Sequence, residues 1–231
     1  MHIGTGSLVR IALFIDGGYF DEVSTFYKYQ HWRGARISLE GLQKFVRNKV
    51  AELEQRDLLR CQIIECHYFR GRFPAAKVDA AGRLRDQAAF DDVLIKTGVT
   101  AHYLPIFWTA DGAPKEKGID VWLSLEAYDL AVHKGYDVLA LMGCDGDYVP
   151  LVRKLGSMGI RSLVLAWDFE YAFDDGTGKQ IKKEVKTAQA LLAASTYPVK
   201  MGELIENGLR DNDEAVQSLF VAAVGSWETN G

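Results

Sequence analysis

The sequence predicts an α/β fold with a mostly parallel central sheet. Short apolar runs rich in Val, Ile, Leu and Phe alternate along the chain with longer segments that carry apolar residues at helical spacing. The apolar runs are nearly continuous, which is typical of strands buried on both faces of a parallel sheet. Strands that alternate with helices in this way imply right-handed βαβ crossovers. We therefore expect about five to six strands, joined by helices.

The first expected strand covers 8–15, where LVRIALFI ends at the turn Asp16-Gly17-Gly18. A helix is expected to follow over 39–53, because apolar residues recur there at three- and four-residue spacings. Ser38 precedes this pattern and has the side chain of an N-cap. The beginning of the chain thus predicts one buried strand and one amphipathic helix.

The second expected strand is CQIIECHYF at 61–69. Gly, Ala and Pro make 71–82 an expected exposed loop. A helix over 86–97 with Gly98 as its C-cap then leads to a third strand at 99–107. The polar residues that follow, up to Lys117, are expected to form a connection.

The second half of the chain repeats the alternation of helix and strand. Glycines close two of its helices, at positions 135 and 159. The expected helices are 119–134, 148–158, 188–195 and 211–227. The expected strands are 136–142, 161–166 and 197–200. The polar, glycine-containing segment 168–184 is expected to be a loop.

Composition is that of a globular protein, and we expect one domain over 1–231. Of the 231 residues, 48% are hydrophobic; 27 basic and 31 acidic residues give a net charge of −4. No run approaches the ~18 apolar residues of a membrane helix, and the N-terminus lacks a signal-peptide core. The three cysteines lack zinc-ligand spacing, so a reducing cytoplasm is expected. The apolar stripe that ends in Trp227 should pack on its own domain, with a homodimer as the alternative.

Acidic residues stand where strands end. Asp16 ends the first strand, Asp145 and Asp147 follow the strand at 136–142, and Asp120 opens a helix. Because ligands of open α/β sheets bind beyond the carboxyl ends of the strands, we expect these carboxylates to converge there. Each Asp alone is a common turn former or helix cap. A cluster of them is relieved of its repulsion by a hard cation, Mg²⁺ or Mn²⁺.

Three segments resemble the signature blocks of the NYN-domain, LabA-like family of the PIN-like nuclease superfamily. They read IALFIDGGYF (11–20), KGIDVWLSLEAYDLA (117–131) and LMGCDGDYVPLVRKLGSMGIRSLVL (141–165). The likeness covers 10–166, weakens up to about 205, and leaves 167–231 as a C-terminal extension with a terminal helix. It implies a Rossmann-like, three-layer α/β/α fold and a metal-dependent ribonuclease. The acidic positions of the family fall on Asp16, Asp120, Asp145 and Asp147.

The resemblance also implies a mechanism. One or two Mg²⁺ or Mn²⁺ ions held by the four Asp residues would lower the pKa of a water and neutralise charge on the scissile phosphate. Two positions depart from the family pattern: Gly18 stands where Asn is frequent, and Glu126 where Asp is frequent. Glu126 lies about 600° around the helix from Asp120, so the two do not share a face. We therefore keep Glu126 outside the metal site.

Basic residues are expected to hold the RNA, although the whole chain is acidic. The basic residues after the second expected strand are interleaved with Tyr68, Phe69 and Phe73. In RNA-binding sites, aromatic rings stack on unpaired bases and basic side chains bind phosphate. The alternative is a solvated loop with its aromatic residues packed underneath. The expected RNA contacts are Tyr19, Arg70, Arg72, Lys77, Lys115 and Lys117.

Two other functions remain open. A non-catalytic PIN-like module would bind RNA or a protein in regulation, but it has no need of four acids facing an anionic ligand. A phosphatase or phosphotransferase would use Asp16 as its nucleophile. That class carries an Asp-x-Asp pair, and this chain has Gly18 at the second position.

Overall fold

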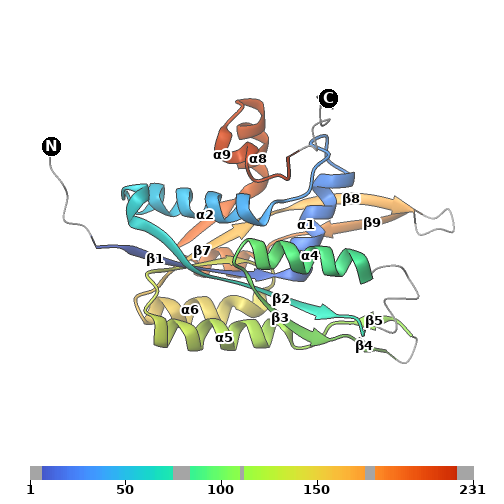
Figure 1. The fold of residues 1–231 in the computed structure, drawn as a ribbon, viewed down its shortest axis with the longest axis horizontal. Coiled ribbons are helices and arrows are strands. Elements are labelled where there is room, and N and C mark those ends of the chain that lie inside the picture. Colours follow the sequence, from blue (N-terminus) through green and yellow to red (C-terminus); the bar gives the residue numbers. More distant parts are fainter. Residues whose placement is uncertain (1–6, 75–83, 110–111, 175–179, 223–231) are drawn as a thin grey trace, which may run out of the picture.

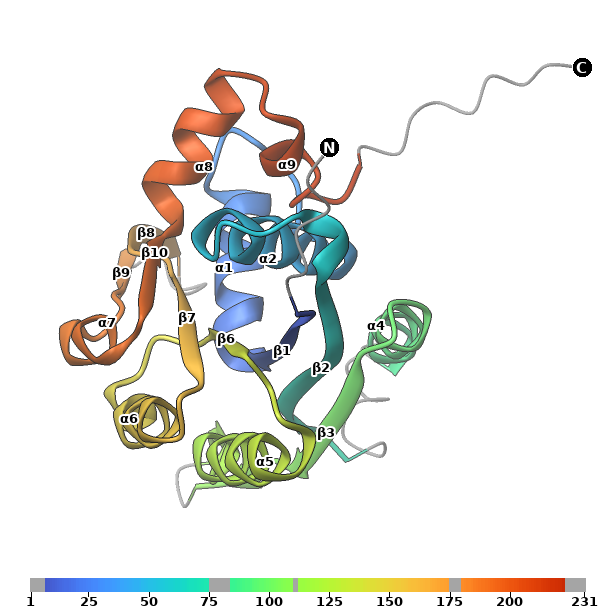
Figure 2. The ribbon, with the colours of Figure 1, turned by 90° about the vertical axis from the view of Figure 1, so that its left-hand side faces the viewer.

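Parallel strands form the central sheet of the fold (Figure 1), and Figure 2 shows them in the order β10-β7-β6-β1-β2-β3. The computed structural model describes residues 7–74, 84–109, 112–174 and 180–222. The strands of the sheet are β1 (Val9–Asp16), β2 (Cys61–Arg72), β3 (Thr100–Pro105), β6 (Val138–Met142), β7 (Arg161–Ala166) and β10 (Tyr197–Lys200). This architecture confirms the expected three-layer α/β fold with a parallel sheet.

Helices cover both faces of the sheet, as Figure 2 shows along the strands. The face with the larger core cluster carries α1 (Gly17–Tyr29), α2 (Leu39–Leu53), α4 (Leu84–Lys96), α8 (Met201–Arg210) and α9 (Glu214–Gln217). The opposite face carries α5 (Ile119–Lys134), α6 (Val149–Ser157) and α7 (Gln189–Ala194). Side chains of β1 alternate between the two cores, Leu13 in one and Phe14 in the other, so both faces of this strand are buried.

The strand order reverses between β1 and β6, which are neighbours in the sheet. From β1 the chain passes over one face to β2, which pairs with β1 on its other side. It later crosses through α5 on the opposite face to reach β6. The carboxyl ends of β1 and β6 therefore form a topological switch point, the usual place for a ligand site in this class of fold.

Several predicted elements agree closely with the structure. The expected helix 119–134 and the strands at 161–166 and 197–200 have the observed bounds. The Oγ of Ser38 accepts a hydrogen bond from the Gly41 N–H at 3.1 Å, which confirms this residue as the N-cap of α2.

Other segments differ from the prediction. The expected loop 168–184 is instead the antiparallel hairpin of β8 (Phe169–Asp174) and β9 (Gln180–Val185). The expected strand at 99–107 divides into β3 and β4 (Phe107–Trp108), and β4 pairs with β5 (Pro114–Lys115) inside the expected polar connection. Strand β2 continues through Arg72 because its end pairs with β3. The remainder of the expected loop 71–82 lies largely outside the described residues.

The C-terminal prediction of a helix over 211–227 is wrong. Helix α8 ends at Arg210, Asn212 has a left-handed φ of 56°, and the Asp213 carboxylate caps the short α9. The apolar residues of the predicted stripe that the structure describes are buried: Val216, Leu219 and Phe220. They pack on their own domain beside α2, and Trp227 lies outside the described residues.

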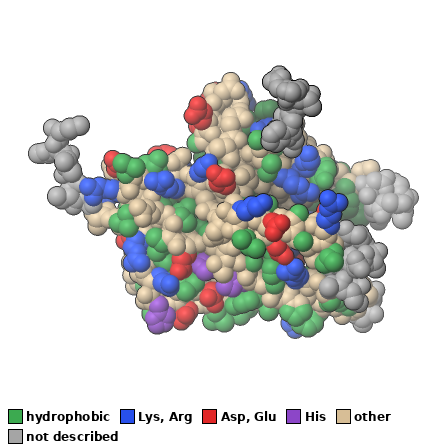
Figure 3. All heavy atoms as spheres, viewed as in Figure 1, with side chains coloured by type: hydrophobic (Ala, Val, Ile, Leu, Met, Phe, Trp, Pro, Cys, Tyr) green, Lys and Arg blue, Asp and Glu red, His purple; other side chains and the backbone are tan. Residues whose placement is uncertain are grey.

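The surface of the face that carries α2 and α4 mixes acidic and basic side chains (Figure 3).

Short 3₁₀ turns, η1 (Leu58–Arg60) and η2 (Gly146–Tyr148), complete the described secondary structure. The three cysteines are free thiols. Within the described part of the chain, each helix is too short or too polar to cross a membrane.

Candidate active site

A hollow of about 230 Å³ lies at the switch point, beyond the ends of β1 and β6. Of the four predicted acidic residues, Asp16, Asp120 and Asp145 line it. Two carboxylates that the sequence reading missed line it as well, Glu22 from α1 and Glu116 from the segment before α5. The other lining residues are Gly18, Tyr19, Lys117, Gly118, Ile119 and Cys144. The hollow is therefore walled by carboxylates from five positions of the chain.

Asp16 is held rigidly because it ends β1 and caps α1 at once. Its Oδ1 accepts hydrogen bonds from the Gly18 N–H at 2.8 Å and the Tyr19 N–H at 3.2 Å. Burial raises the pKa of Asp16, although these bonds and one from Tyr148 act in the opposite direction. Gly18 also allows the close approach of Arg70, whose Nη1 would lie 2.9 Å from a Cβ at this position.

Asp120 reaches the same place from the first turn of α5. The preceding Gly118 has a left-handed φ of 82°, a conformation that favours glycine. Burial and the charge of Asp16 raise the pKa of Asp120. The charges of Asp145 and Asp147 act in the same direction. The charges of the other three Asp residues thus make ionisation of Asp120 less favourable.

The Tyr148 hydroxyl joins the first two carboxylates. It donates toward Asp16 Oδ2 at 2.9 Å and lies 3.3 Å from Asp120 Oδ1. The ring is fully buried, and burial with the charges of Asp16 and Asp120 raises the pKa of this phenol. Tyr148 therefore keeps its proton and offers it to the acid pair. The sequence pattern predicts only the start of a helix at Tyr148 and carries no signal for this role.

Asp145 and Asp147 lie in the turn that follows β6. Asp145 caps the turn η2, where its Oδ1 accepts a hydrogen bond from the Asp147 N–H at 3.0 Å. Both side chains are exposed, and Asp145 lines the hollow whereas Asp147 does not. The effect of Asp147 on the Asp120 pKa is electrostatic.

The donor chemistry of this hollow fits a hard divalent cation. Such cations take carboxylate oxygens as ligands. A positive charge would offset the cost of ionising the buried Asp16 and the repulsion between Asp120 and the neighbouring carboxylates. Lys117 is the basic side chain among the lining residues. In the side-chain positions that the structure describes, no three His, Cys, Asp or Glu residues form a ready metal-binding group.

Two further groups bear on the type of chemistry. Burial and the charge of Asp16 raise the pKa of Cys144 to about 12, so this residue is a thiol and a poor nucleophile. Both carboxylate oxygens of Asp16 accept hydrogen bonds within the fold. That arrangement, with Gly18 in place of a second acid, does not favour Asp16 as the nucleophile of a phosphatase.

Arg70 borders the hollow but is paired with acids. Its guanidinium bridges Asp21 Oδ2 and Glu116 Oε1, each at 3.1 Å, and 29% of the side chain is exposed. Arg72 lies farther along β2, with Nη2 2.7 Å from Asp91 Oδ2 and the guanidinium over the Tyr103 ring. Contacts of either arginine with RNA remain a prediction.

The other predicted RNA contacts have different environments. Lys115 and Lys117 are exposed, and Lys117 lines the hollow. Lys77 lies outside the described residues. The Tyr19 ring is only 4% exposed, and its hydroxyl donates to the Trp167 carbonyl oxygen and accepts from the Trp167 N–H. This burial counts against a contact between the Tyr19 ring and RNA.

Comparison with known proteins assigns the fold and a family. The family model described as the NYN domain matches residues 10–206. A comparison with curated proteins gave no match. Among solved structures, the chain is similar to a protein of unknown function from Vibrio parahaemolyticus, with a TM-score of 0.53 and 15% sequence identity. That alignment covers 86% of this chain and 96% of the other, and it supports the fold alone.

Proposed function

Because the chain belongs to the NYN domain family, whose members are generally nucleases, we propose that it is a metal-dependent ribonuclease. The proposed active centre consists of Asp16, Asp120, Asp145 and Asp147. The observation that carries the proposal is the acid pair Asp16–Asp120 with its shared Tyr148 hydroxyl at the switch point. Burial and mutual repulsion raise the pKa of Asp120, and a bound cation would remove that cost.

The residues in and beside the hollow have different proposed roles. Asp16, Asp120 and Asp145 would hold Mg²⁺ or Mn²⁺, with Asp147 adding negative charge nearby. When bound, the cation supplies neutralisation of phosphate charge and a lower pKa for water. Asp16 keeps its orientation through the two backbone N–H groups of α1. Lys117 lines the hollow and would attract the phosphate backbone.

The test is cleavage of a labelled single-stranded RNA by the purified protein with Mn²⁺ or Mg²⁺, and again with EDTA. We expect cleavage that EDTA abolishes, and a rate at least about 100-fold lower for Asp120→Asn, because a ligand should matter no less than residues that orient ligands. Glu126→Gln is the control, since it removes a carboxylate of the same helix outside the hollow. Its rate should match that of the wild type.

Three results would contradict the proposal. Wild-type protein that binds RNA without cleaving it would favour the non-catalytic module. Equal rates for the wild type and Asp120→Asn would move the active centre elsewhere. Faster turnover of a generic phosphate monoester than of RNA would favour a phosphatase.

A further inference from the structure

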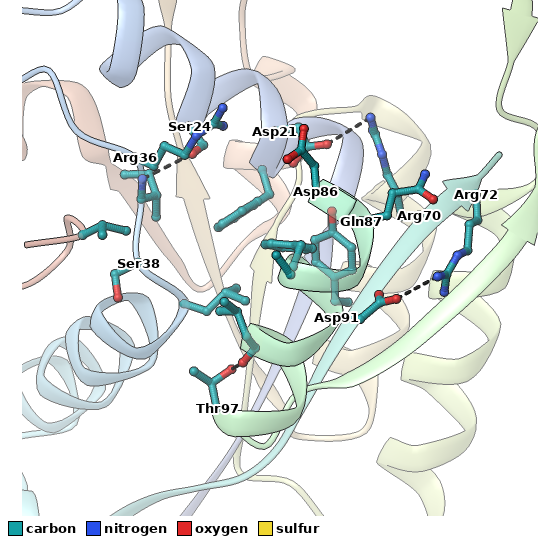
Figure 4. Close-up of a pocket in the computed structure, with 18 of the residues that line it drawn as sticks. Asp21, Ser24, Arg36, Ser38, Arg70, Arg72, Asp86, Gln87, Asp91 and Thr97 are labelled. Atoms are coloured by element: carbon teal, nitrogen blue, oxygen red, sulfur yellow. Dashed lines mark hydrogen bonds and ion pairs between the residues drawn. The ribbon is translucent and has the colours of Figure 1, made fainter. Parts of the chain in front are cut away.

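A larger cavity of about 820 Å³ lies next to the hollow, on the face of the sheet that carries α1, α2 and α4. Figure 4 shows it bounded by α4, by the end of β2 and by the segments around α1 and α2. Its volume is in the range of pockets that enclose small ligands. The proposed function makes no use of this cavity.

Aromatic rings form one wall of the cavity. Phe20, Tyr68 and Phe90 line it, and their rings meet with centroids 5.3–6.1 Å apart. Val93 extends this wall along α4 and is 41% exposed. Phe20 and Tyr68 are only 3% and 2% exposed, so the accessible apolar surface of this wall belongs to the half-buried Phe90 and to Val93, where an unpaired base can pack.

Polar groups line the remainder of the cavity, and two of its arginines are paired with acids, Arg70 with Asp21 and Arg72 with Asp91. The same lining includes Arg36, near Asp21, and the amide of Gln87 on α4. Figure 4 shows Asp21, Gln87 and Arg70 among the residues that line the cavity, with a dashed line between Asp21 and Arg70. An amide can pair with the edge of a base, and a guanidinium with phosphate.

Arg70 separates the cavity from the hollow. Its guanidinium bonds on one side to Asp21, which lines the cavity, and on the other to Glu116, which lines the hollow. A guanidinium has five N–H donors, so the two ion pairs leave donors for a third anion. A phosphate at the edge of the hollow would therefore meet the same arginine that closes the cavity.

We propose that this cavity receives one unpaired nucleotide of the RNA, next to the phosphate that is cut. The inference rests on the proposed function, because it places the cleaved phosphate in the hollow. The base packs on Phe90 and Val93, with Phe20 and Tyr68 buried behind them, and Gln87 contacts its edge. Arg70 contacts the phosphate that joins this nucleotide to the one at the acids. The enzyme thus requires a single-stranded nucleotide beside the cut.

The test fills the cavity and measures RNA binding separately from cleavage. Val93→Trp places a large side chain on the lining, and Ile95→Trp is the matched control on the same helix, where Ile95 is 75% exposed and lies outside the lining. Fluorescence anisotropy with a labelled single-stranded RNA, in EDTA to prevent cleavage, gives Kd. We expect Kd to rise between about 5- and 100-fold for Val93→Trp, as loss of one stacked base would produce. It should stay within twofold for Ile95→Trp.

A second probe guards against misfolding of Val93→Trp. In a set of RNAs that each lack one base, the wild-type protein should lose affinity when the base at one particular position is missing. Gln87→Ala should raise the Kd for intact RNA more than the Kd for the RNA that lacks this base. An equal Kd for wild type and Val93→Trp, or equal affinity for every abasic RNA, would overturn the inference. Cleavage of the same RNA by the wild type, with Mn²⁺ in place of EDTA, would leave the proposed function standing. Absence of cleavage with intact binding would instead remove the proposed function.

Discussion

At the scale of single residues, one hydroxyl group serves two carboxylates. The Tyr148 phenol has a single proton, and Asp16 Oδ2 and Asp120 Oδ1 lie 2.9 and 3.3 Å from its oxygen. Its ring is packed so closely against Gly143 that a Cβ at this glycine would lie 2.8 Å from the ring. The packing fixes the hydroxyl, and the hydroxyl fixes the spacing of the acids.

Tyr148→Phe should therefore retain the fold and lose activity. We expect a 10- to 100-fold loss in RNA cleavage and a comparable loss in Mn²⁺ affinity, the usual range for residues that orient ligands. Tyr136→Phe is the control, because the Tyr136 hydroxyl also donates to a carboxylate, that of Glu65. Tyr136 precedes β6 and so lies at the amino ends of the strands, away from the hollow. Wild-type cleavage and Mn²⁺ affinity in Tyr148→Phe would show that the hydroxyl has no positioning role.

The acid residues themselves were predictable, whereas their partners were not. Asp16 and Asp145 follow apolar strands, and parallel strands end at a common edge, so the pattern alone brings them together. Glu22 and Glu116 carry no such signal, because their placement depends on how α1 turns and on how the chain enters α5. The ion pairs of Arg70 likewise join residues far apart in sequence, Asp21 and Glu116.

At the scale of elements, segments with a strong apolar periodicity were predicted correctly, whereas a helix of low intrinsic propensity was missed. Helix α5 was predicted to its bounds, but α1 was missed because it opens with Gly17-Gly18 and is rich in aromatic and β-branched residues. Packing of Phe20, Val23 and Tyr27 on the core stabilises it instead. The β8–β9 hairpin did carry a signal: residues 169, 171 and 173 are aromatic, at the period of a strand.

The contact between α2 and α9 can be tested at Gly41. A Cβ at this position would collide with the backbone carbonyl of Ser218, beyond the end of α9. Gly41→Ala should lower the free energy of unfolding by about 1–3 kcal/mol, the cost of overpacking. Gly156→Ala is the opposite case on α6, where a Cβ meets no atom within 4 Å. It should raise stability by about 0.5–1 kcal/mol in urea unfolding, and a reversed order of the two variants would contradict the packing.

A histidine pair between β2 and β3 predicts how stability depends on pH. His102 stacks on Phe69 and lies 3.0 Å from His67, which in turn contacts Glu65. Burial and His67 lower the pKa of His102 from 6.5 to about 4. Between these values the unfolded chain binds more protons than the native state, so stability falls as pH falls through 6.5 toward 4.

His102→Gln should flatten that pH dependence, because glutamine retains a polar group and does not titrate. For the wild type, urea unfolding between pH 7 and 5 should show a loss that steepens to at most about 1.4 kcal/mol per pH unit from this group. Carboxylates titrate mainly below this range. Parallel curves for wild type and His102→Gln would show that His102 keeps its ordinary pKa in the fold.

At the scale of the whole molecule, the proposed function requires an acidic protein to bind a polyanion through a small basic area. The chain carries a net charge of −4, and Arg70 and Arg72 are paired with acids. RNA affinity should therefore depend weakly on salt. If Arg70, Lys115 and Lys117 contact three phosphates, the slope of log K against log salt is about −2 for a single strand. Lys117→Ala should reduce the magnitude of the slope by about 0.7. A wild-type slope steeper than about −5 would contradict this prediction and indicate a larger basic surface that binds RNA.

Calorimetric titration of metal-free protein with Mn²⁺ shows whether the strand-end carboxylates bind a divalent cation. We expect one or two sites in the wild type, equal binding by Glu126→Gln, and loss of binding in Asp120→Asn. A non-cleavable RNA oligonucleotide, added to all three proteins, should strengthen binding by supplying phosphate oxygens. Equal Mn²⁺ affinity in wild type and Asp120→Asn, or no binding by the wild type with the oligonucleotide present, would contradict this expectation.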